Sequence, residues 1–97
     1  MNERPVRWSR RAISNLKAIS VAIAKDNPRA SVRVTERLWA ATEHLSRHPF
    51  MGRIGRIKHS RELALSDLPY VIGYRVFESH IAIISILHAA RDRPESP

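Results

Sequence analysis

The chain has 97 residues with 43% hydrophobic and 27% charged side chains, a composition that predicts one small folded core and excludes whole-chain disorder. It contains no cysteine, which excludes disulfide cross-links, thiolate metal ligands and a thiol nucleophile. Fourteen arginines and three lysines against nine acidic residues give a formal net charge of +8. This charge favours an anionic partner, either nucleic acid or an acidic protein segment, although a generally basic, soluble surface would account for it as well.

The N-terminal residues predict a short strand followed by a helix. Residues 4–8 fit a strand with Val6 and Trp8 on one face, and Ser9 is a candidate N-cap for the helix. Hydrophobic residues then recur at the spacing of one helical face, namely Ala12, Leu16, Ile19 and Ile23. Arginines before residues 18–24 give this region a faint likeness to a signal peptide, but the lysines on both sides of that run favour the helix.

A second helix is expected after a short connection. Asn27 is a candidate N-cap, and Pro28 suits the first helical position. The helix should end near Arg47, because the residue before Pro49 disfavours helical backbone. Its hydrophobic stripe is Val34, Leu38, Ala41 and Leu45. The short connection predicts an antiparallel helical hairpin over about residues 9–47.

The C-terminal half predicts a small antiparallel sheet. A loop is expected over 49–60 and a polar tail over 89–97. Strands are expected over 61–65, 70–77 and 80–88. The predicted fold class is therefore α+β: an N-terminal strand and a helical hairpin packed on a small antiparallel sheet, with a C-terminal three-stranded region over about 61–88. The 97 residues are expected to form a single domain.

The last two strands can be aligned from the sequence. If residues 78–79 form a two-residue loop, Arg75 lies opposite Ala82, and Tyr74 lies opposite Ile83. The face expected to pack on the helices comprises Tyr70, Ile72, Tyr74, Val76, Ile81, Ile83, Ser85 and Leu87. The other face comprises Val71, Gly73, Arg75, Phe77, Ala82, Ile84, Ile86 and His88. A slip of one residue would exchange the two faces.

The sequence lacks the motifs of several common catalytic chemistries. Gly52 and Gly55 do not have the spacing or the Lys-Ser/Thr ending of a phosphate-binding loop, and no serine has the context of a nucleophile elbow. His44 and His48 are four residues apart, but no third zinc ligand accompanies them. We therefore expect no metal and no cofactor. The longest apolar run, residues 81–87, is too short to span a bilayer.

A set of basic residues is associated with the predicted sheet. These candidates for anion binding are Lys58, Arg61, Arg75, His88 and Arg91. Arg75 is unusual because it lies in the middle of an apolar strand. One explanation is an exposed position paired with Glu62 or Glu78. The other is a cationic sheet face that receives an anion.

Two further features have a structural and a functional interpretation. Trp8 and Trp39 fit the edges of a small core, and the alternative is stacking on nucleic-acid bases. Arg29, Arg33 and Arg37 recur every four residues on the second helix. Such a stripe is usually a solvated face, but it would also serve as a docking surface for acidic residues.

Several short segments, in this order, carry a family resemblance. They are Trp8-Ser9, Asp26-Asn27-Pro28-Arg29-Ala30, Leu45 with Pro49-x-x-Gly52-Arg53, Arg61-Glu62-Leu63, Pro69-Tyr70-Val71-Ile72-x-Tyr74-Arg75-Val76, and Ile83-x-x-Ile86-Leu87-His88-x-x-Arg91. Together they resemble the RelE/ParE superfamily of type II toxins from Val6 to Pro94.

The resemblance implies a compact α+β fold in which the N-terminal strand joins the sheet. It implies a bacterial cytoplasmic toxin that forms a hetero-oligomer with a cognate, ParD-like antitoxin. The acidic, flexible C-terminal segment of such an antitoxin would be steered by charge and would fold as it wraps the toxin. The candidates for antitoxin binding are Arg29, Arg33, Arg37 and Arg75.

Two activities compete within the superfamily. RelE-like members cleave messenger RNA on the ribosome, whereas ParE-like members inhibit DNA gyrase without known catalytic chemistry of their own. The nuclease alternative implies an active site of Arg61, Arg75, His88 and Lys58. The chain has no tyrosine after Tyr74, although the nucleases carry one near their C-terminus, and acid–base catalysis needs its partners within hydrogen-bond reach.

The ending His88-x-x-Arg91 and the pair Pro69-Tyr70 also resemble ParE. The hypothesis from the sequence is therefore a ParE-like toxin that inhibits DNA gyrase and is neutralised by an antitoxin. A RelE-like endoribonuclease acting on ribosome-bound mRNA is the main alternative, and a toxin-fold interaction module without activity is a second.

Overall fold

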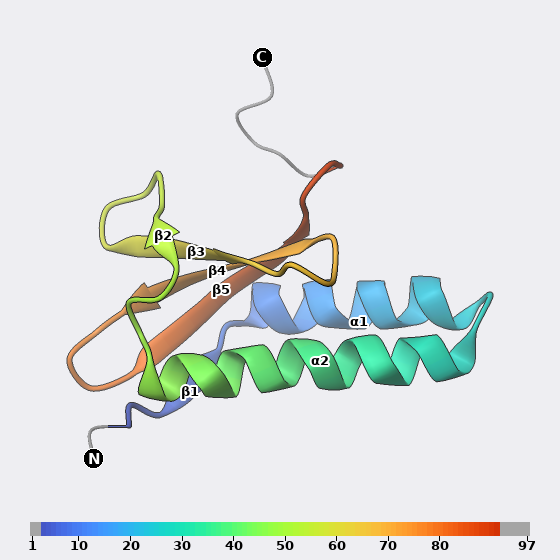
Figure 1. The fold of residues 1–97 in the computed structure, drawn as a ribbon, viewed down its shortest axis with the longest axis horizontal. Helices are drawn as coiled ribbons and strands as arrows, with labels where there is room; N and C mark the ends of the chain where they lie inside the picture. Colours follow the sequence, from blue (N-terminus) through green and yellow to red (C-terminus); the bar gives the residue numbers. More distant parts are fainter. Residues whose placement is uncertain (1–2, 92–97) are drawn as a thin grey trace.

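The computed structural model describes residues 3–91 as two helices packed on one face of a five-stranded sheet (Figure 1). The elements are β1 (Val6–Trp8), α1 (Arg10–Ala24), α2 (Pro28–Arg47), β2 (Arg53–Ile54), β3 (Ser60–Ala64), β4 (Tyr70–Val76) and β5 (Ile81–His88). The strands lie in the order β1-β5-β4-β3-β2, and only the β1–β5 pair is parallel. The predicted α+β class is confirmed, with the N-terminal strand joined to the sheet.

Both helices begin at the predicted N-caps. The Ser9 hydroxyl accepts a hydrogen bond from the Ala12 N–H at 3.0 Å, and the Asn27 side chain accepts one from the Ala30 N–H at 3.0 Å. Pro28 occupies the first turn of α2, where a missing N–H costs nothing. α2 ends at Arg47, as the following His-Pro pair predicts.

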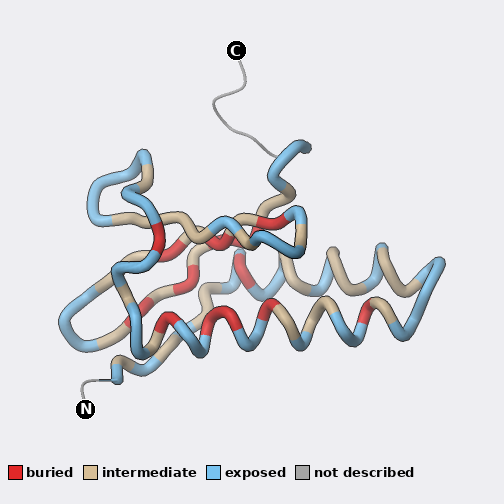
Figure 2. The backbone as a smooth tube through the Cα atoms, viewed as in Figure 1, coloured by how far each residue is buried: buried red, intermediate tan, exposed pale blue. Residues whose placement is uncertain are grey.

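The hydrophobic core lies where the helices cross the sheet (Figure 2). Its buried members are Ala12, Leu38, Ala41, Leu45, Tyr70, Ile72, Tyr74, Ile81, Ile83 and Ile86. Toward the connection between the helices, α1 and α2 extend beyond the sheet, and there the hydroxyl groups of Ser20 and Ser31 bond to each other at 3.0 Å (Figure 1). The predicted stripes of α2 and of β4 therefore face the core.

The alignment of β4 with β5 is correct near their turn and wrong beyond it. Phe77 donates its N–H to the His80 carbonyl, and Tyr74 lies opposite Ile83, as predicted. Between Gly73 and Tyr74 the register shifts, so Gly73 lies opposite Ser85 and one extra residue of β5 is accommodated.

This β-bulge exchanges the faces of β5 after Ile84. Ile86 belongs to the buried core, although the uninterrupted alignment places it outside. Ser85 turns to the open face, since a Cβ added to Gly73 would lie 2.8 Å from its Oγ. Leu87 pairs with Val71 on that same open face, and His88 pairs with Tyr70 on the helix side. The predicted faces of these four β5 residues are therefore corrected.

Helix α1 supplies the hydrogen bonds that the bulged strand lacks. The Asn15 side chain accepts the Ile86 N–H at 3.0 Å, and the Ser9 hydroxyl donates to the Ile84 carbonyl at 3.0 Å. β1 ends at Trp8, opposite Ile83, so these backbone groups lie just beyond its reach. Two polar side chains thus satisfy a strand edge that would otherwise be left unpaired.

The predicted loop after α2 contains a further strand. β2 pairs with β3 through Arg53 opposite Glu62 and Ile54 opposite Arg61. A strand of two residues lacks the alternation from which strands are predicted, so the sequence showed only a loop. Most of the predicted polar tail, residues 92–97, lies outside the described residues.

We expect the bulge to determine which isoleucines of β5 stabilise the fold. Ile86→Ala should lower the free energy of unfolding by about 2–5 kcal/mol, as should Leu38→Ala and Ile83→Ala, because each leaves a cavity in the core. Ile84→Ala, a half-buried control on the same strand, should cost less. Urea denaturation followed by circular dichroism measures these differences, and equal losses at Ile84 and Ile86 would contradict the bulge.

Candidate functional site

The segment that follows α2 is fastened to the sheet by a buried tyrosine. The Tyr74 hydroxyl donates to the Pro49 carbonyl at 2.8 Å and accepts the Gly52 N–H at 2.9 Å. A Cβ at Gly52 would lie 2.6 Å from that hydroxyl, so the close approach requires glycine. Burial raises the pKa of Tyr74 above its usual 10.0, more than the Gly52 N–H and the charge of Arg61 lower it.

Arg61 fastens the same segment from β3. Its Nη1 donates to the Gly52 carbonyl at 2.8 Å and to the Phe50 carbonyl at 3.3 Å, and its guanidinium lies 5.0 Å from the centre of the Phe50 ring. Since Arg61 lies opposite Tyr74, it stands on the same side of the sheet as that tyrosine. Arg61 is therefore engaged with backbone carbonyls and an aromatic ring.

Arg75 lies on the open face of the sheet. It lies opposite Ser60 on one side and Ala82 on the other, and Arg7 lies beyond Ala82 on β1. Since neighbouring strands are about 4.8 Å apart, the two arginine backbones are about 10 Å apart with a small residue between them. Long arginine side chains at that spacing can converge on one anion.

The ion pair proposed for Arg75 does not form. Glu62 pairs with Arg53 at 3.1 Å, and within residues 3–91 Arg75 makes no salt bridge. The sequence does not predict that Arg7 lies on the same face as Arg75, because this placement depends on the parallel pairing of β1 with β5, which no local pattern in the sequence reveals.

His88 lies at the other end of the sheet and on its helix side. Its ring meets Tyr70 edge to face at 5.6 Å between centroids, and its Nδ1 accepts the N–H groups of Ala90 and Arg91 at 3.1 and 3.2 Å. With Arg91 it lines an open groove of about 690 Å³ against α1. A ring nitrogen occupied as an acceptor of two backbone N–H groups is not available as a general base.

The five basic candidates thus do not form one site. Lys58 is exposed in the tight connection between β2 and β3, where His59 has a positive φ of 66°. Arg61 and Arg75 share one end of the sheet but stand on opposite faces, and His88 with Arg91 lies at the opposite end of β5. The single cationic sheet face predicted for these residues is not observed.

The arginine stripe of α2 is also divided. Arg37 forms a two-pronged pair with Asp67, with nitrogen–oxygen distances of 2.7 and 3.0 Å, and this pairing lowers the pKa of that carboxyl group. Arg29 and Arg33 are exposed near the start of the helix. Arg75 lies on the open face of the sheet and so does not share a surface with them.

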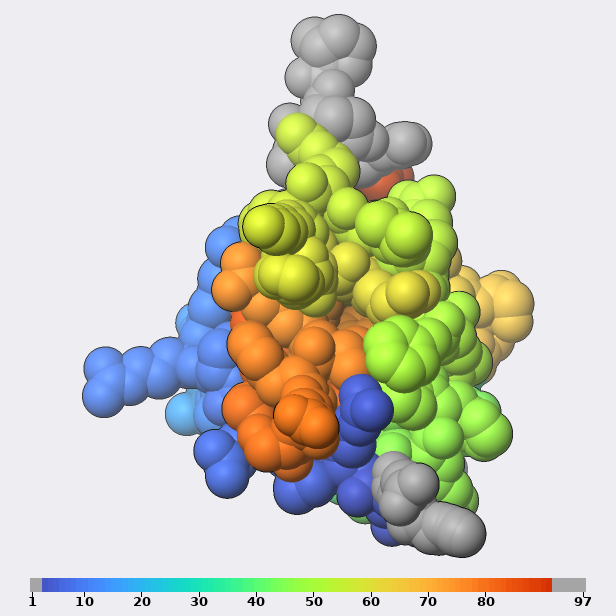
Figure 3. Space-filling model, turned by 90° about the vertical axis from the view of Figure 1, so that its left-hand side faces the viewer, coloured from blue at the N-terminus to red at the C-terminus, as the bar shows by residue number. Residues whose placement is uncertain are grey.

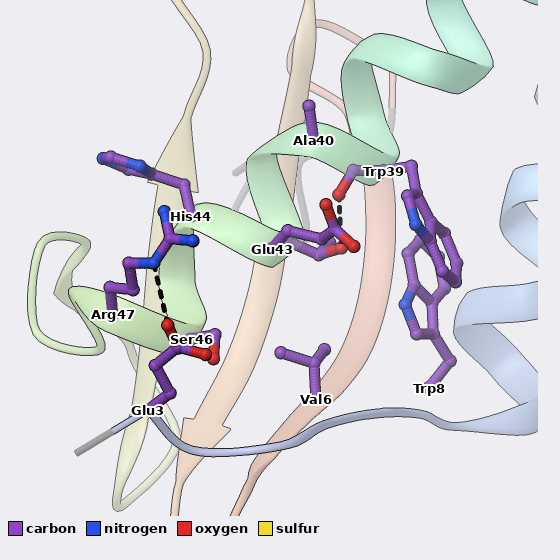
Figure 4. Close-up of a pocket in the computed structure, with 10 residues that line it drawn as sticks. Glu3, Val6, Trp8, Trp39, Ala40, Glu43, His44, Ser46 and Arg47 are labelled. Carbon is purple, nitrogen blue, oxygen red and sulfur yellow. Dashed lines mark hydrogen bonds and ion pairs between the residues drawn. The ribbon is translucent and has the colours of Figure 1, made fainter. Parts of the chain in front are cut away.

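The two tryptophans form one wall of a groove between β1 and α2 (Figure 4). Their rings stack with centroids 5.2 Å apart and an interplanar angle of 15°. The groove measures about 440 Å³, and Glu3 pairs with Arg47 at its opposite end at 3.0 Å. None of the predicted basic candidates lines it. The stack consolidates the edge of the core, as the structural interpretation of the two tryptophans predicts.

Residues 3–91 support neither a metal site at His44 and His48 nor a membrane-spanning helix. The rings of His44 and His48 lie 4.6 Å apart, but over that range no cluster of three or more metal-ligating side chains occurs. Neither of the two described helices has the length and apolar character that crossing a bilayer requires.

Comparison with known proteins supplies the family. Residues 6–93 match the ParE toxin of the type II toxin-antitoxin system parDE. The chain belongs to the ParE toxin family. A putative toxin, Y4kP of Sinorhizobium fredii, is 40% identical over 95 residues, which cover 98% of both chains. The resemblance drawn from the sequence motifs is therefore confirmed, and this ParE-family chain is a toxin of a type II toxin-antitoxin system.

Two further matches bear on this ParE-family chain. Toxin RelE2 of Caulobacter vibrioides is 38% identical over 84 residues, or 87% of this chain and 93% of that relative. A solved structure, the chromosomal ParDE TA system from P. aeruginosa, superimposes with a TM-score of 0.81 at 21% identity and covers 91% of this chain and 98% of that one. At this identity the structural match supports the fold alone.

Replacing Tyr74 with phenylalanine should loosen the segment after α2. The buried Gly52 N–H loses its acceptor, so the free energy of unfolding should fall by about 1–3 kcal/mol. The wild type should also lose stability as the pH rises through 10, because the phenol ionises more readily in the unfolded chain. Tyr74→Phe should lack this alkaline component, and identical pH profiles of unfolding would contradict the assignment.

Proposed function

We propose that this chain inhibits DNA gyrase in the bacterial cytoplasm. A cognate antitoxin neutralises it by forming a hetero-oligomer with it. Membership of the ParE toxin family supports the proposal. The structural observation that carries it is the separation of Arg61, Arg75 and His88, the residues that a nuclease would need together. A protein that acts by binding a target needs surfaces and no assembled catalytic group.

The antitoxin is expected to be acidic because the toxin keeps a large uncompensated positive charge. Of its 17 basic side chains, three form salt bridges within residues 3–91, to Asp67, Glu3 and Glu62. Arg29 and Arg33 on α2 and Arg75 on the open sheet face remain the candidates for contact with antitoxin carboxylates. Arg37 would have to exchange Asp67 for such a partner.

The decisive experiment is a supercoiling assay with purified toxin. Relaxed plasmid, ATP and gyrase are mixed with increasing amounts of the folded chain, and supercoiling should decline as the toxin is added. Prior addition of the antitoxin from the neighbouring gene should restore it. If the toxin arrests growth in cells but gyrase still supercoils the plasmid in the presence of excess toxin, gyrase is not the target.

A ribosome-dependent endoribonuclease is the second candidate, favoured by the 38% identity to RelE2. In this alternative Arg61 and Arg75 bind phosphate, Lys58 assists and His88 transfers a proton. We expect His88→Ala to arrest growth as the wild type does, with transcripts intact in both strains by primer extension. The matched control is His44→Ala on α2. If the wild-type toxin cleaves transcripts and the His88→Ala variant does not, the chain is a nuclease.

A further inference from the structure

The segment from Pro49 to Gly52 holds an aromatic side chain in solvent. Three of its four residues have backbone groups bound by the sheet: Tyr74 binds the Pro49 carbonyl and the Gly52 N–H, and Arg61 binds the carbonyls of Phe50 and Gly52. Phe50 nevertheless keeps 57% of its surface exposed. An apolar side chain held this firmly outside the core adds little to folding and is already ordered for binding.

Two guanidinium groups frame this ring. The Arg4 guanidinium carbon lies 5.4 Å from the ring centre and that of Arg61 lies 5.0 Å from it. Neither arginine has a carboxylate partner among the described residues, because Glu3 pairs with Arg47 and Glu62 with Arg53. The ring and these two guanidinium groups, which have no carboxylate partner within residues 3–91, therefore form one unit on the surface.

The apolar surface continues onto β2. Ile54 lies directly opposite Arg61 and is 77% exposed, more than any other large hydrophobic residue of the described chain. In Figure 3 the dark-blue N-terminal residues and the green segment after α2 meet on the face turned to the viewer. We call Arg4, Phe50, Ile54 and Arg61 the Phe50 patch.

The chemistry of the Phe50 patch distinguishes between possible partners. Guanidinium groups already lie over the ring, so its face is not free to stack on a nucleic-acid base. An exposed phenylalanine and isoleucine beside arginines are instead typical of the centre of a protein interface. Because the two positive charges have no carboxylate partners within residues 3–91, a complementary partner surface would carry carboxylates opposite them.

We propose that the Phe50 patch is the surface with which this toxin engages its protein target, an acidic surface with an apolar pocket that receives Phe50. The inference rests on the proposed function, because DNA gyrase serves as the target in its test. Carboxylates at the rim of the pocket would pair with Arg4 and Arg61, while Ile54 would cover the neighbouring apolar surface.

The test compares two phenylalanines in the full-length toxin. Phe50→Ala should weaken binding to purified gyrase at least tenfold and reduce growth arrest in step. Phe77→Ala, which removes a second exposed phenylalanine at the β4–β5 turn, should leave both within twofold. Circular dichroism and binding to the antitoxin from the neighbouring gene should be unchanged for both variants, which shows that each is folded.

A charge reversal provides an independent variant. Arg4→Glu should weaken gyrase binding at least tenfold, and the difference from the wild type should shrink at high salt. The matched control is Arg10→Glu, an exposed arginine in the first turn of α1 where an acidic residue is well tolerated. Arg61 is left intact because it also holds the loop.

The outcomes separate this proposal from the function on which it rests. If Phe50→Ala binds gyrase as the wild type does, the Phe50 patch is not the target-binding surface. The same conclusion follows if the variant loses only antitoxin binding, only self-association in sedimentation or only binding of duplex DNA. If the wild type itself does not bind gyrase, the proposed target is wrong and growth arrest decides instead. If Phe50→Ala then arrests growth as strongly as Phe77→Ala does, the proposal for the Phe50 patch is wrong. Loss of growth arrest in Phe50→Ala alone would support it.

Discussion

The β-bulge between β4 and β5 determines which basic side chains of the sheet share a face. One extra residue at Ile84 exchanges the faces of the strand, which brings Ile86 into the core and His88 to the helix side. Without it, His88 would share the open face with Arg75, as a sheet-based nuclease site requires. The bulge persists because Ser9, the N-cap of α1, and Asn15 within the helix satisfy the backbone groups beside it. A detail of hydrogen bonding at the start of a helix thus decides which side chains can act together.

The basic residues of this ParE-family toxin fall into groups with different surroundings. Arg37, Arg47 and Arg53 form exposed ion pairs, which contribute little to stability. Arg61 orders a loop, and Arg7 with Arg75 occupies the open sheet face. High net charge therefore corresponds to several separate surfaces. With this arrangement, the proposed antitoxin and the proposed target would meet different basic surfaces.

Much of the fold could be predicted because its signals are local. The N-caps at Ser9 and Asn27, the helical stripes and the two-residue turn before His80 each depend on neighbouring residues. The family could be predicted because many weak motifs occur in the right order. The bulge could not, since its stabilising groups on α1 lie more than 70 positions away in sequence. Only part of the candidate site was foreseen, because Phe50 looks like an ordinary loop residue until Tyr74 and Arg61 are seen to hold it.

The parallel pairing of β1 with β5 has a consequence for the synthesis of the protein. β5 lies between β1 and β4, so the last strand of the fold is an inner strand of the sheet and pairs with the first strand, which forms an edge. Contacts between residues so distant in sequence form slowly, because the chain loses the entropy of closing a long loop before the contacts stabilise it. While the chain emerges from the ribosome, the helical hairpin can form early, but the sheet lacks an inner strand until residue 88 has been added. The sheet of a toxin built this way is therefore completed only after β5 has been made, although the helical hairpin can form before it.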